Sequence, residues 1–153
     1  YIAQDGSLHI NGGAIYDSSE NTVVLAAATN VPSSATFSPA AGSTNVCLVT
    51  ITIKDASGTA MAYPVMGVVS LADASTGAGL TATTASGTVA AKASSGTDLS
   101  TLVSKKALKV QSKADGTYIL SITDSAKTGF YPVVHIPGVA PVVGSALVTG
   151  NYG

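Results

Sequence analysis

Apolar and polar residues alternate at every second position in two stretches of the chain, residues 46–54 and 117–123. In the first, VCLVTITIK, one face holds Cys47, Val49, Ile51 and Ile53. In the second, TYILSIT, one face holds Tyr118, Leu120 and Ile122, while the other is mostly Thr and Ser. A period of two is the pattern of a β-strand with one buried face. Both stretches are therefore predicted strands that contribute these side chains to a common core.

Further short apolar stretches are separated by turn residues at intervals of roughly 8–12 residues. The additional predicted strands are residues 34–38, 65–71, 107–112, 130–136 and 142–149, with turns at 39–42 and 55–58. Residues 65–71 are mostly apolar, which predicts burial on both faces or an edge strand beneath a loop. Residues 98–104 are interpreted as a short turn or helical piece. Because helical periodicity is almost absent, the pattern predicts an all-β sandwich or barrel.

A turn at Asp115 and Gly116 places Tyr118 near the start of its strand. Such a tyrosine can bury its ring and return its hydroxyl to nearby backbone, as in the tyrosine corner of immunoglobulin-like sandwiches. The predicted fold class is therefore all-β, an immunoglobulin-like β-sandwich. Residues 73–96, rich in Ala, Thr, Ser and Gly, are predicted to form a hairpin of small-residue strands, since a free linker usually carries more charge.

The first 32 residues differ from the rest of the chain. Short β-like pieces at residues 7–10, 14–16 and 22–25 are joined by turn sequences at 11–13 and 17–21. They contain too few apolar residues to bury a core of their own. We therefore divide the chain into an extended N-terminal β-arm, residues 1–32, and a β-sandwich, residues 33–153. The arm is expected to pack on the sandwich or on another subunit.

Only 10% of the 153 residues are charged, and the formal net charge is -1. The surface must then consist largely of Ser, Thr, Ala and Gly, with few charges to keep sheet edges from pairing with another chain. Homo-oligomerisation is expected. Nucleic acid is not, because a nearly neutral chain does not attract a phosphate backbone. The lysines of residues 105–113 are interpreted as a solvated strand edge. No membrane partner is expected either, since the longest apolar runs, such as residues 23–28, are far too short to span a bilayer.

Residues capable of catalysis or metal binding are present but scattered. His9 and His135 lie far apart, without a G-x-S-x-G motif or a partner at zinc-ligand spacing. Cys47 is the single cysteine and is expected in the core. Turn chemistry, rather than a calcium loop, accounts for the aspartates of the predicted turns, Asp5, Asp17, Asp55, Asp73 and Asp115. No catalytic, cofactor-binding or metal-binding residue is assigned, and the chain is predicted not to be an enzyme.

An intramolecular Lys–Asn bond, known in some pilin and adhesin sandwiches, requires a buried carboxylate beside a buried lysine. Glu20 is the only glutamate and lies in a predicted turn, although an aspartate could take its place. This bond is therefore not expected.

Four stretches carry a resemblance to a known group of proteins. In chain order they are ATFSPAAGSTNVCLVTITIKDASGTA, LADASTGAGLTATTASGTV, KKALKVQSKADGTYILSITDSAKTGFYPVV and ALVTGNYG. With them, the chain from about residue 32 to residue 153 resembles phage virion proteins that have an immunoglobulin-like domain, described as head decoration, head fibre or structural proteins. Bacterial surface sandwiches share the phrases VTITIKDASG and ADGTYILSITD, so it is the order of the stretches and the closing VTGNYG that point to the phage group.

The resemblance implies a non-enzymatic phage virion structural protein, foremost a capsid decoration or cement protein that stabilises the head or is displayed on it. The implied partners are the major capsid protein or another virion protein, together with further copies of the chain; a trimer follows from capsid symmetry by analogy. The implied location is the surface of the phage particle, where the arm, residues 1–32, would contact a neighbouring subunit or the capsid. The family has no active-site residues or cofactor to carry over.

Two other interpretations remain open at this point. The chain could be a subunit of an extracellular filament, a tail tube or a bacterial cell-surface adhesin, assembled by strand exchange through the arm. It could also be a carbohydrate-binding β-domain, which would use exposed aromatic side chains among Tyr16, Tyr63, Tyr131 and Tyr152. The first alternative places the chain outside the cell rather than on a virion.

Overall fold

The computed structural model describes residues 10–11, 14–15 and 30–153. In the N-terminal segment, β1 (Ile10–Asn11) pairs antiparallel with β2 (Ala14–Ile15), with Ile10 opposite Ile15. This pairing agrees with the turn predicted at residues 11–13. The other predictions for residues 1–29 lie outside the described residues, and the proposed boundary at residue 32 stays a prediction. Within the described ranges, no helix is both long and apolar enough to cross a membrane.

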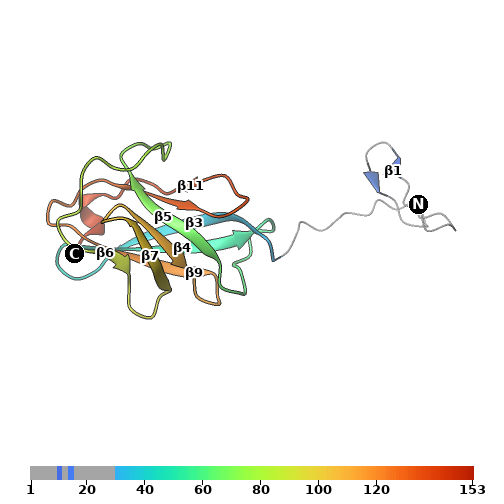
Figure 1. Cartoon of the computed structure of the whole chain (residues 1–153), viewed down its shortest axis with the longest axis horizontal. Coiled ribbons are helices and arrows are strands. Elements are labelled where there is room, and N and C mark those ends of the chain that lie inside the picture. Colours follow the sequence, from blue (N-terminus) through green and yellow to red (C-terminus); the bar gives the residue numbers. More distant parts are fainter. Residues whose placement is uncertain (1–9, 12–13, 16–29) are drawn as a thin grey trace.

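Two antiparallel sheets make up the rest of the described chain and pack face to face (Figure 1). The four-stranded sheet has the order β3-β4-β9-β6, where the strands are β3 (Pro32–Ala41), β4 (Val46–Asp55), β9 (Thr117–Thr123) and β6 (Val89–Ala91). The five-stranded sheet has the order β11-β10-β5-β8-β7, where the strands are β11 (Val142–Val143), β10 (Tyr131–His135), β5 (Met66–Ala72), β8 (Ala107–Gln111) and β7 (Thr97–Val103). A single 3-10 turn, η1 (Thr149–Asn151), follows.

The strand order is that of an immunoglobulin-like sandwich. The sheet β3-β4-β9-β6 corresponds to immunoglobulin strands A, B, E and D, and β5, β10 and β11 correspond to C, F and G. The β7–β8 hairpin is an addition between strands D and E, and β8 extends the second sheet beside β5. The predicted fold class is therefore confirmed.

The core is built on the two strands whose alternation was clearest in the sequence. β4 and β9 pair antiparallel, so that Val49 lies opposite Leu120 and Ile51 opposite Tyr118. The predicted inward side chains of both strands are at most 3% exposed. Burying an aliphatic side chain of this size stabilises the fold by about 1.5–3 kcal/mol. These two strands are thus the main source of core burial in the four-stranded sheet.

The second half of β5, residues 69–72, is buried on both faces, whereas Met66 at its start is exposed. Val69 and Leu71 point into the core, while Ser70 and Ala72 are buried on the opposite face. There, residues 73–79 pass over the sheet, and a Cβ at Gly77 would lie 2.6 Å from a methyl group of Val143. Burial on both faces is therefore confirmed for residues 69–71 but not for Met66, and the strand is central in its sheet, so its prediction as an edge strand was wrong.

The sequence prediction for Tyr118 was right about the ring and wrong about the hydroxyl. The ring is buried, and a Cβ at Gly96 would lie 2.5 Å from its Cδ2 atom. The hydroxyl, however, donates to Asp98 Oδ1 at 2.6 Å instead of to nearby backbone. Burial, with the adjacent Asp98 carboxylate, raises the pKa of Tyr118. A backbone-directed tyrosine does exist, but it is Tyr152, whose hydroxyl donates to the Thr128 carbonyl at 2.8 Å.

Several boundaries differ from the sequence predictions. Residues 98–103 belong to strand β7 rather than to a turn or helical piece, because this stretch pairs with β8; the turn follows at residues 104–106. Strand β3 continues through Pro39, which an edge strand tolerates, and the turn follows at residues 42–45. Only Val142–Val143 of the predicted strand 142–149 pairs with β10.

The predicted small-residue hairpin in residues 73–96 was also wrong, since β6 is its only strand. Carboxylates take the backbone N–H groups that a hairpin would use. Asp73 accepts from Ala82 at 2.8 Å, and Asp124 accepts from Ser86 at 3.1 Å. Side-chain acceptors of this kind offer the backbone an alternative to a strand ladder.

Candidate functional site

Two aspartates of the predicted turns, Asp55 and Asp115, stabilise their own loops. Asp55 Oδ1 accepts from the Ser57 backbone N–H and hydroxyl, at 2.9 and 2.6 Å, and from the Thr59 N–H at 2.9 Å. Asp115 accepts from the Thr117 N–H at 3.0 Å and from its hydroxyl. Hydrogen bonds from Ser57 lower the pKa of Asp55, and those from Thr117 lower the pKa of Asp115 to about 2. The turn interpretation is thus confirmed for these residues.

The described carboxylates do not converge on one point. Across residues 10–11, 14–15 and 30–153, no three His, Cys, Asp or Glu side chains lie close enough together to hold a metal ion. Asp5, Asp17 and His9 lie outside the described residues. Cys47 is fully buried, as predicted, and burial raises the pKa of its thiol to about 11.

One Ser–His contact appears that the sequence did not indicate. Ser70 Oγ on β5 lies 3.3 Å from His135 Nε2 on the neighbouring strand β10. Ser70 is only 4% exposed, and in residues 30–153 no carboxylate is hydrogen-bonded to this imidazole. A serine nucleophile needs an accessible hydroxyl and a base oriented by a third group. This pair links two strands and lacks both features.

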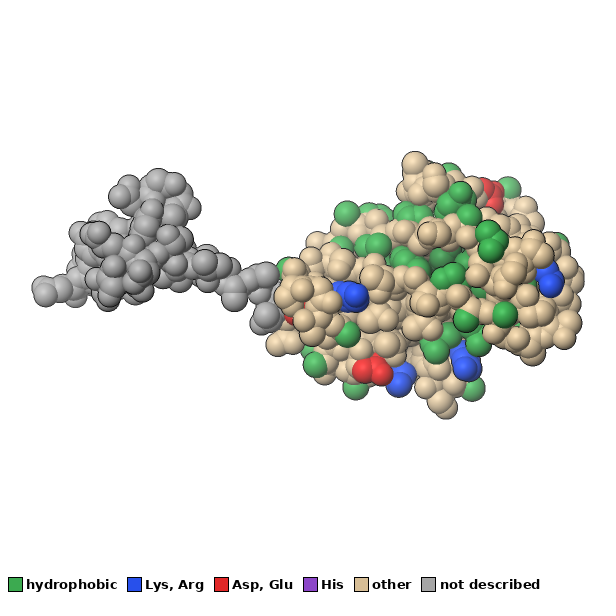
Figure 2. Space-filling model, turned by 180° about the vertical axis from the view of Figure 1, so that it is seen from behind, with side chains coloured by type: hydrophobic (Ala, Val, Ile, Leu, Met, Phe, Trp, Pro, Cys, Tyr) green, Lys and Arg blue, Asp and Glu red, His purple; other side chains and the backbone are tan. Residues whose placement is uncertain are grey.

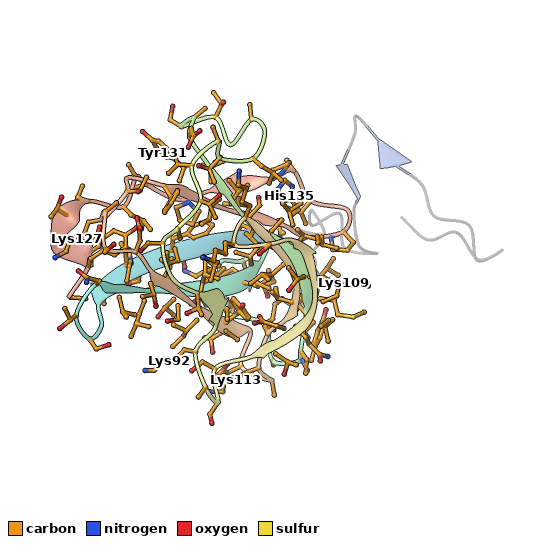
Figure 3. The ribbon with its side chains drawn as sticks, turned by 60° about the vertical axis from the view of Figure 1, so that its left-hand side comes forward. Lys92, Lys109, Lys113, Lys127, Tyr131 and His135 are labelled. Atoms are coloured by element: carbon orange, nitrogen blue, oxygen red, sulfur yellow. The ribbon has the colours of Figure 1, made fainter. Side chains whose placement is uncertain are left out.

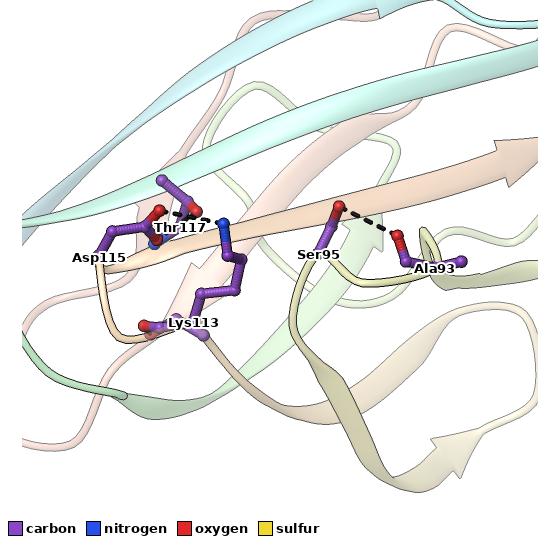
Figure 4. A network of polar contacts seen from close by, with 6 residues as sticks. Ala93, Ser95, Lys113, Asp115 and Thr117 are labelled. Atoms are coloured by element: carbon purple, nitrogen blue, oxygen red, sulfur yellow. Dashed lines mark hydrogen bonds and ion pairs between the residues drawn. The ribbon is translucent and has the colours of Figure 1, made fainter.

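The four lysines of residues 105–113 have separate roles. Lys105 donates to the carbonyls of Ala85 and Ser86, and Lys106 donates to that of Ala82, so both tie down residues 82–86. Lys113 forms an exposed ion pair with Asp115 at 3.1 Å (Figure 4). Their interpretation as a strand edge was wrong, because β8 lies between β5 and β7.

A shallow groove of about 410 Å³ lies on the outer face of the five-stranded sheet. It is lined by Met66, Gly67, Val68, Lys109, His135, Ile136 and Pro137. The strand register creates it, because Val68 on β5 lies opposite both His135 on β10 and Lys109 on β8. Figure 3 shows these two polar side chains on the same side of the molecule. The groove therefore has an apolar floor between an imidazole and an ammonium group.

Beyond the groove, further exposed apolar side chains lie on β7, the edge strand of the same sheet. Met66 is 54% exposed, and Leu102 on β7 is 53% exposed. In residues 30–153, half of the eight exposed large hydrophobic side chains belong to this region, namely Met66, Leu99, Leu102 and Val103. Leu99 and Leu102 lie where the β7–β8 register shifts, so two irregularities interrupt this edge strand. We call these four side chains the apolar strip.

The outer face of the four-stranded sheet is different in character. Its side chains are mainly hydroxyl-bearing, and the register places Thr36, Thr52 and Thr117 side by side across three strands. Lys54 is the charged residue of this face on β4. Figure 2 shows the molecule from behind the view of Figure 1, with few charged side chains on that side and a group of hydrophobic ones near its middle. The two outer faces thus offer different surfaces to a partner.

The described residues do not support the carbohydrate-binding interpretation or the intramolecular Lys–Asn bond. Tyr152 is buried, and Tyr63 and Tyr131 lie toward opposite ends of the β5–β10 pair, so these tyrosines form no platform for a sugar; Tyr16 lies outside the described residues. All seven lysines fall within residues 30–153, and none is buried, as an isopeptide bond would require.

The groove and the apolar strip could not be found from the sequence, because both depend on which strands become neighbours. The weak sequence signal was the run of apolar residues at 65–71. Comparison of the chain with models of known protein families finds no match, and comparison with curated proteins finds no match either.

Proposed function

We propose that the chain is a non-enzymatic structural subunit, and specifically a phage virion protein that decorates or cements the capsid. The resemblance of residues 32–153 to such proteins motivates the assignment. The structural observation that supports it is the apolar strip beside the groove, since a sandwich with a low-charge, partly apolar outer face is suited to packing against other subunits. The proposed partners are the major capsid protein or another virion protein, with many copies on the particle surface.

The strip has a clear energetic role in this proposal. Completing the burial of a Leu or Met side chain that is about half exposed adds on the order of 1 kcal/mol. A few such side chains per subunit, repeated over many copies on a particle, stabilise an assembly without any one tight contact. This is the behaviour expected of a cement protein.

The direct test uses phage particles with and without this chain. Particles that carry it should survive heat or low salt better than particles that lack it, and electron microscopy should place it on the head. Leu102→Asp should reduce incorporation, whereas Leu80→Asp, at an exposed leucine outside the strip, should not. Absence of the chain from purified particles would contradict the proposal.

A filament, tail-tube or cell-surface subunit is the second candidate, and one observation favours it. Strand β3 is ten residues long and lies at the edge of the four-stranded sheet, so one side of its backbone is available to a donated strand. In this case the purified chain should form fibres, and deleting residues 1–31 should abolish them. Fibres that persist after the deletion would rule out strand donation by the arm.

A further inference from the structure

Charge is divided unevenly along the chain. Residues 1–31 contain Asp5, Asp17 and Glu20 but no lysine or arginine, whereas residues 32–153 contain all seven lysines and the other five acids. Those five aspartates all accept hydrogen bonds within the sandwich. The N-terminal segment is therefore acidic, whereas the sandwich has two more lysines than acids.

The groove on the five-stranded sheet has the matching chemistry. Lys109 is exposed, and the only ion pair among residues 30–153 is the one between Lys113 and Asp115. The groove is lined by Lys109 and His135 beside an apolar floor of Met66 and Val68, and it contains no carboxylate. Its best occupant is an extended segment that has both apolar and acidic side chains.

The sequence IYDSSENTVVL, residues 15–25, has this composition. Asp17 and Glu20 lie between one apolar pair, Ile15 and Tyr16, and the apolar run at residues 23–25. The chain also enters the sandwich at the end where the groove lies. The Tyr63 hydroxyl donates to the Asn30 carbonyl at 2.5 Å, and Tyr63 precedes the groove residue Met66 by three positions.

We propose that residues 15–25 of one copy bind in the groove of a second copy, with Asp17 and Glu20 facing Lys109 and the apolar residues covering Met66 and Val68. This inference deepens the proposed structural role and rests on it. Stable protein interfaces bury about 1,200–2,000 Å² in total, which one short segment supplies only in part. A reciprocal exchange between two copies forms the contact twice, and a closed dimer is its simplest form.

Charge reversal on each side of the contact tests the pairing in the full-length chain. Lys109→Glu should weaken self-association at least tenfold in sedimentation velocity, and so should the double variant Asp17→Lys/Glu20→Lys. Lys92→Glu is the matched control, because Lys92 is an exposed lysine that follows β6 and lies away from the groove. This variant should self-associate like the parent chain. Combining the groove and segment reversals in one chain should restore association. Equal association of all these variants would overturn the proposal.

A mixing experiment distinguishes exchange between copies from docking within one chain. The Lys109→Glu chain keeps an intact segment, and the Asp17→Lys/Glu20→Lys chain keeps an intact groove. If docking occurs between copies, each variant should stay largely monomeric by itself, and an equimolar mixture of the two should form heterodimers. A mixture that stays monomeric, with thermal unfolding of both variants unchanged, would overturn docking between copies.

The outcome is independent of the test on particles. If the chain is found on phage heads but neither charge reversal changes its self-association, the virion role is supported and the segment-to-groove contact is contradicted. If the chain is missing from particles but both charge reversals weaken its self-association, the contact is supported and the virion role is contradicted.

Discussion

The hydroxyl of Tyr118 on β9 donates a 2.6 Å hydrogen bond to the carboxylate of Asp98 on β7, and this bond connects the two sheets of the sandwich. The second carboxylate oxygen of Asp98 accepts the Ala91 N–H on β6 at 2.8 Å. One side chain of the added β7–β8 hairpin thus binds two strands of the opposite sheet. The carboxylate therefore adds a contact to the three-residue strand β6, which otherwise pairs with β9.

Removing the Tyr118 hydroxyl should destabilise the fold measurably. Tyr118→Phe leaves the ring in place and deprives Asp98 of a donor, which should cost about 1–3 kcal/mol in the free energy of unfolding. Asp98→Ala should cost more, because it also leaves the Ala91 N–H without its acceptor. Urea denaturation measures both values. Tyr131→Phe, at a half-buried tyrosine on β10, is the control and should change stability by less than about 0.5 kcal/mol; a cost for Tyr118→Phe no larger than this would contradict the argument.

The sequence predicted those parts of the fold that depend on local alternation. Strands β4 and β9 were found correctly because each has one buried face, and period-two burial can be read within a single strand. Strand β7 was missed because nearly all of its side chains are exposed, so it has no alternation to detect. The hydroxyl partner of Tyr118 was missed for another reason, since Asp98 lies twenty positions away in the sequence.

The candidate site was less predictable than the fold. Ser70 and His135 are 65 residues apart, and only the pairing of β5 with β10 brings them together. The groove has the same origin, because its floor and its two polar walls come from three different strands. Sequence periodicity predicts which residues are buried, but it does not specify which strands become neighbours across a sheet.

Acid should weaken the fold through Asp124. This carboxylate is 1% exposed; burial by itself would raise its pKa, but hydrogen bonds from Thr128, Ser86 and Ala126 outweigh that and lower it to about 2. Since the folded pKa lies below the unfolded value of 3.8, the stabilisation is complete above pH 3.8 and is lost as the pH falls toward 2. The loss should be about 2 kcal/mol.

Urea denaturation of the parent chain and of Asp124→Asn between pH 5 and pH 2 measures this contribution. The variant should be less stable near pH 5, and its stability should fall less steeply with acid. Equal slopes for the two proteins would assign the acid sensitivity to other carboxylates.

Cys47 should be unreactive until the protein unfolds. Its side chain is fully buried in β4, and burial raises the pKa of the thiol to about 11, so thiolate is scarce at neutral pH. A thiol reagent should label Cys47 slowly under native conditions and rapidly in guanidinium chloride. A Cys47→Ala chain that carries Ser104→Cys, at an exposed turn position, provides the fast reference. Native labelling of Cys47 as fast as this reference would contradict the burial.

Gly77 and Gly79 have nearly the same backbone conformation, so substituting each with alanine distinguishes the effect of close packing from that of backbone strain. Gly77 and Gly79 have φ values of 70° and 71°, so alanine meets the same left-handed penalty, about 1 kcal/mol, at both positions. At Gly77, however, the added Cβ would lie 2.6 Å from a Val143 methyl group, whereas at Gly79 it meets nothing within 4 Å. Gly77→Ala should therefore be the more destabilising of the two, by a further 1–3 kcal/mol or so, because it forces residues 73–79 away from β10 and β11. Thermal or urea denaturation of the two variants measures the difference. Equal destabilisation would mean that this loop does not pack closely on the outer face of the five-stranded sheet.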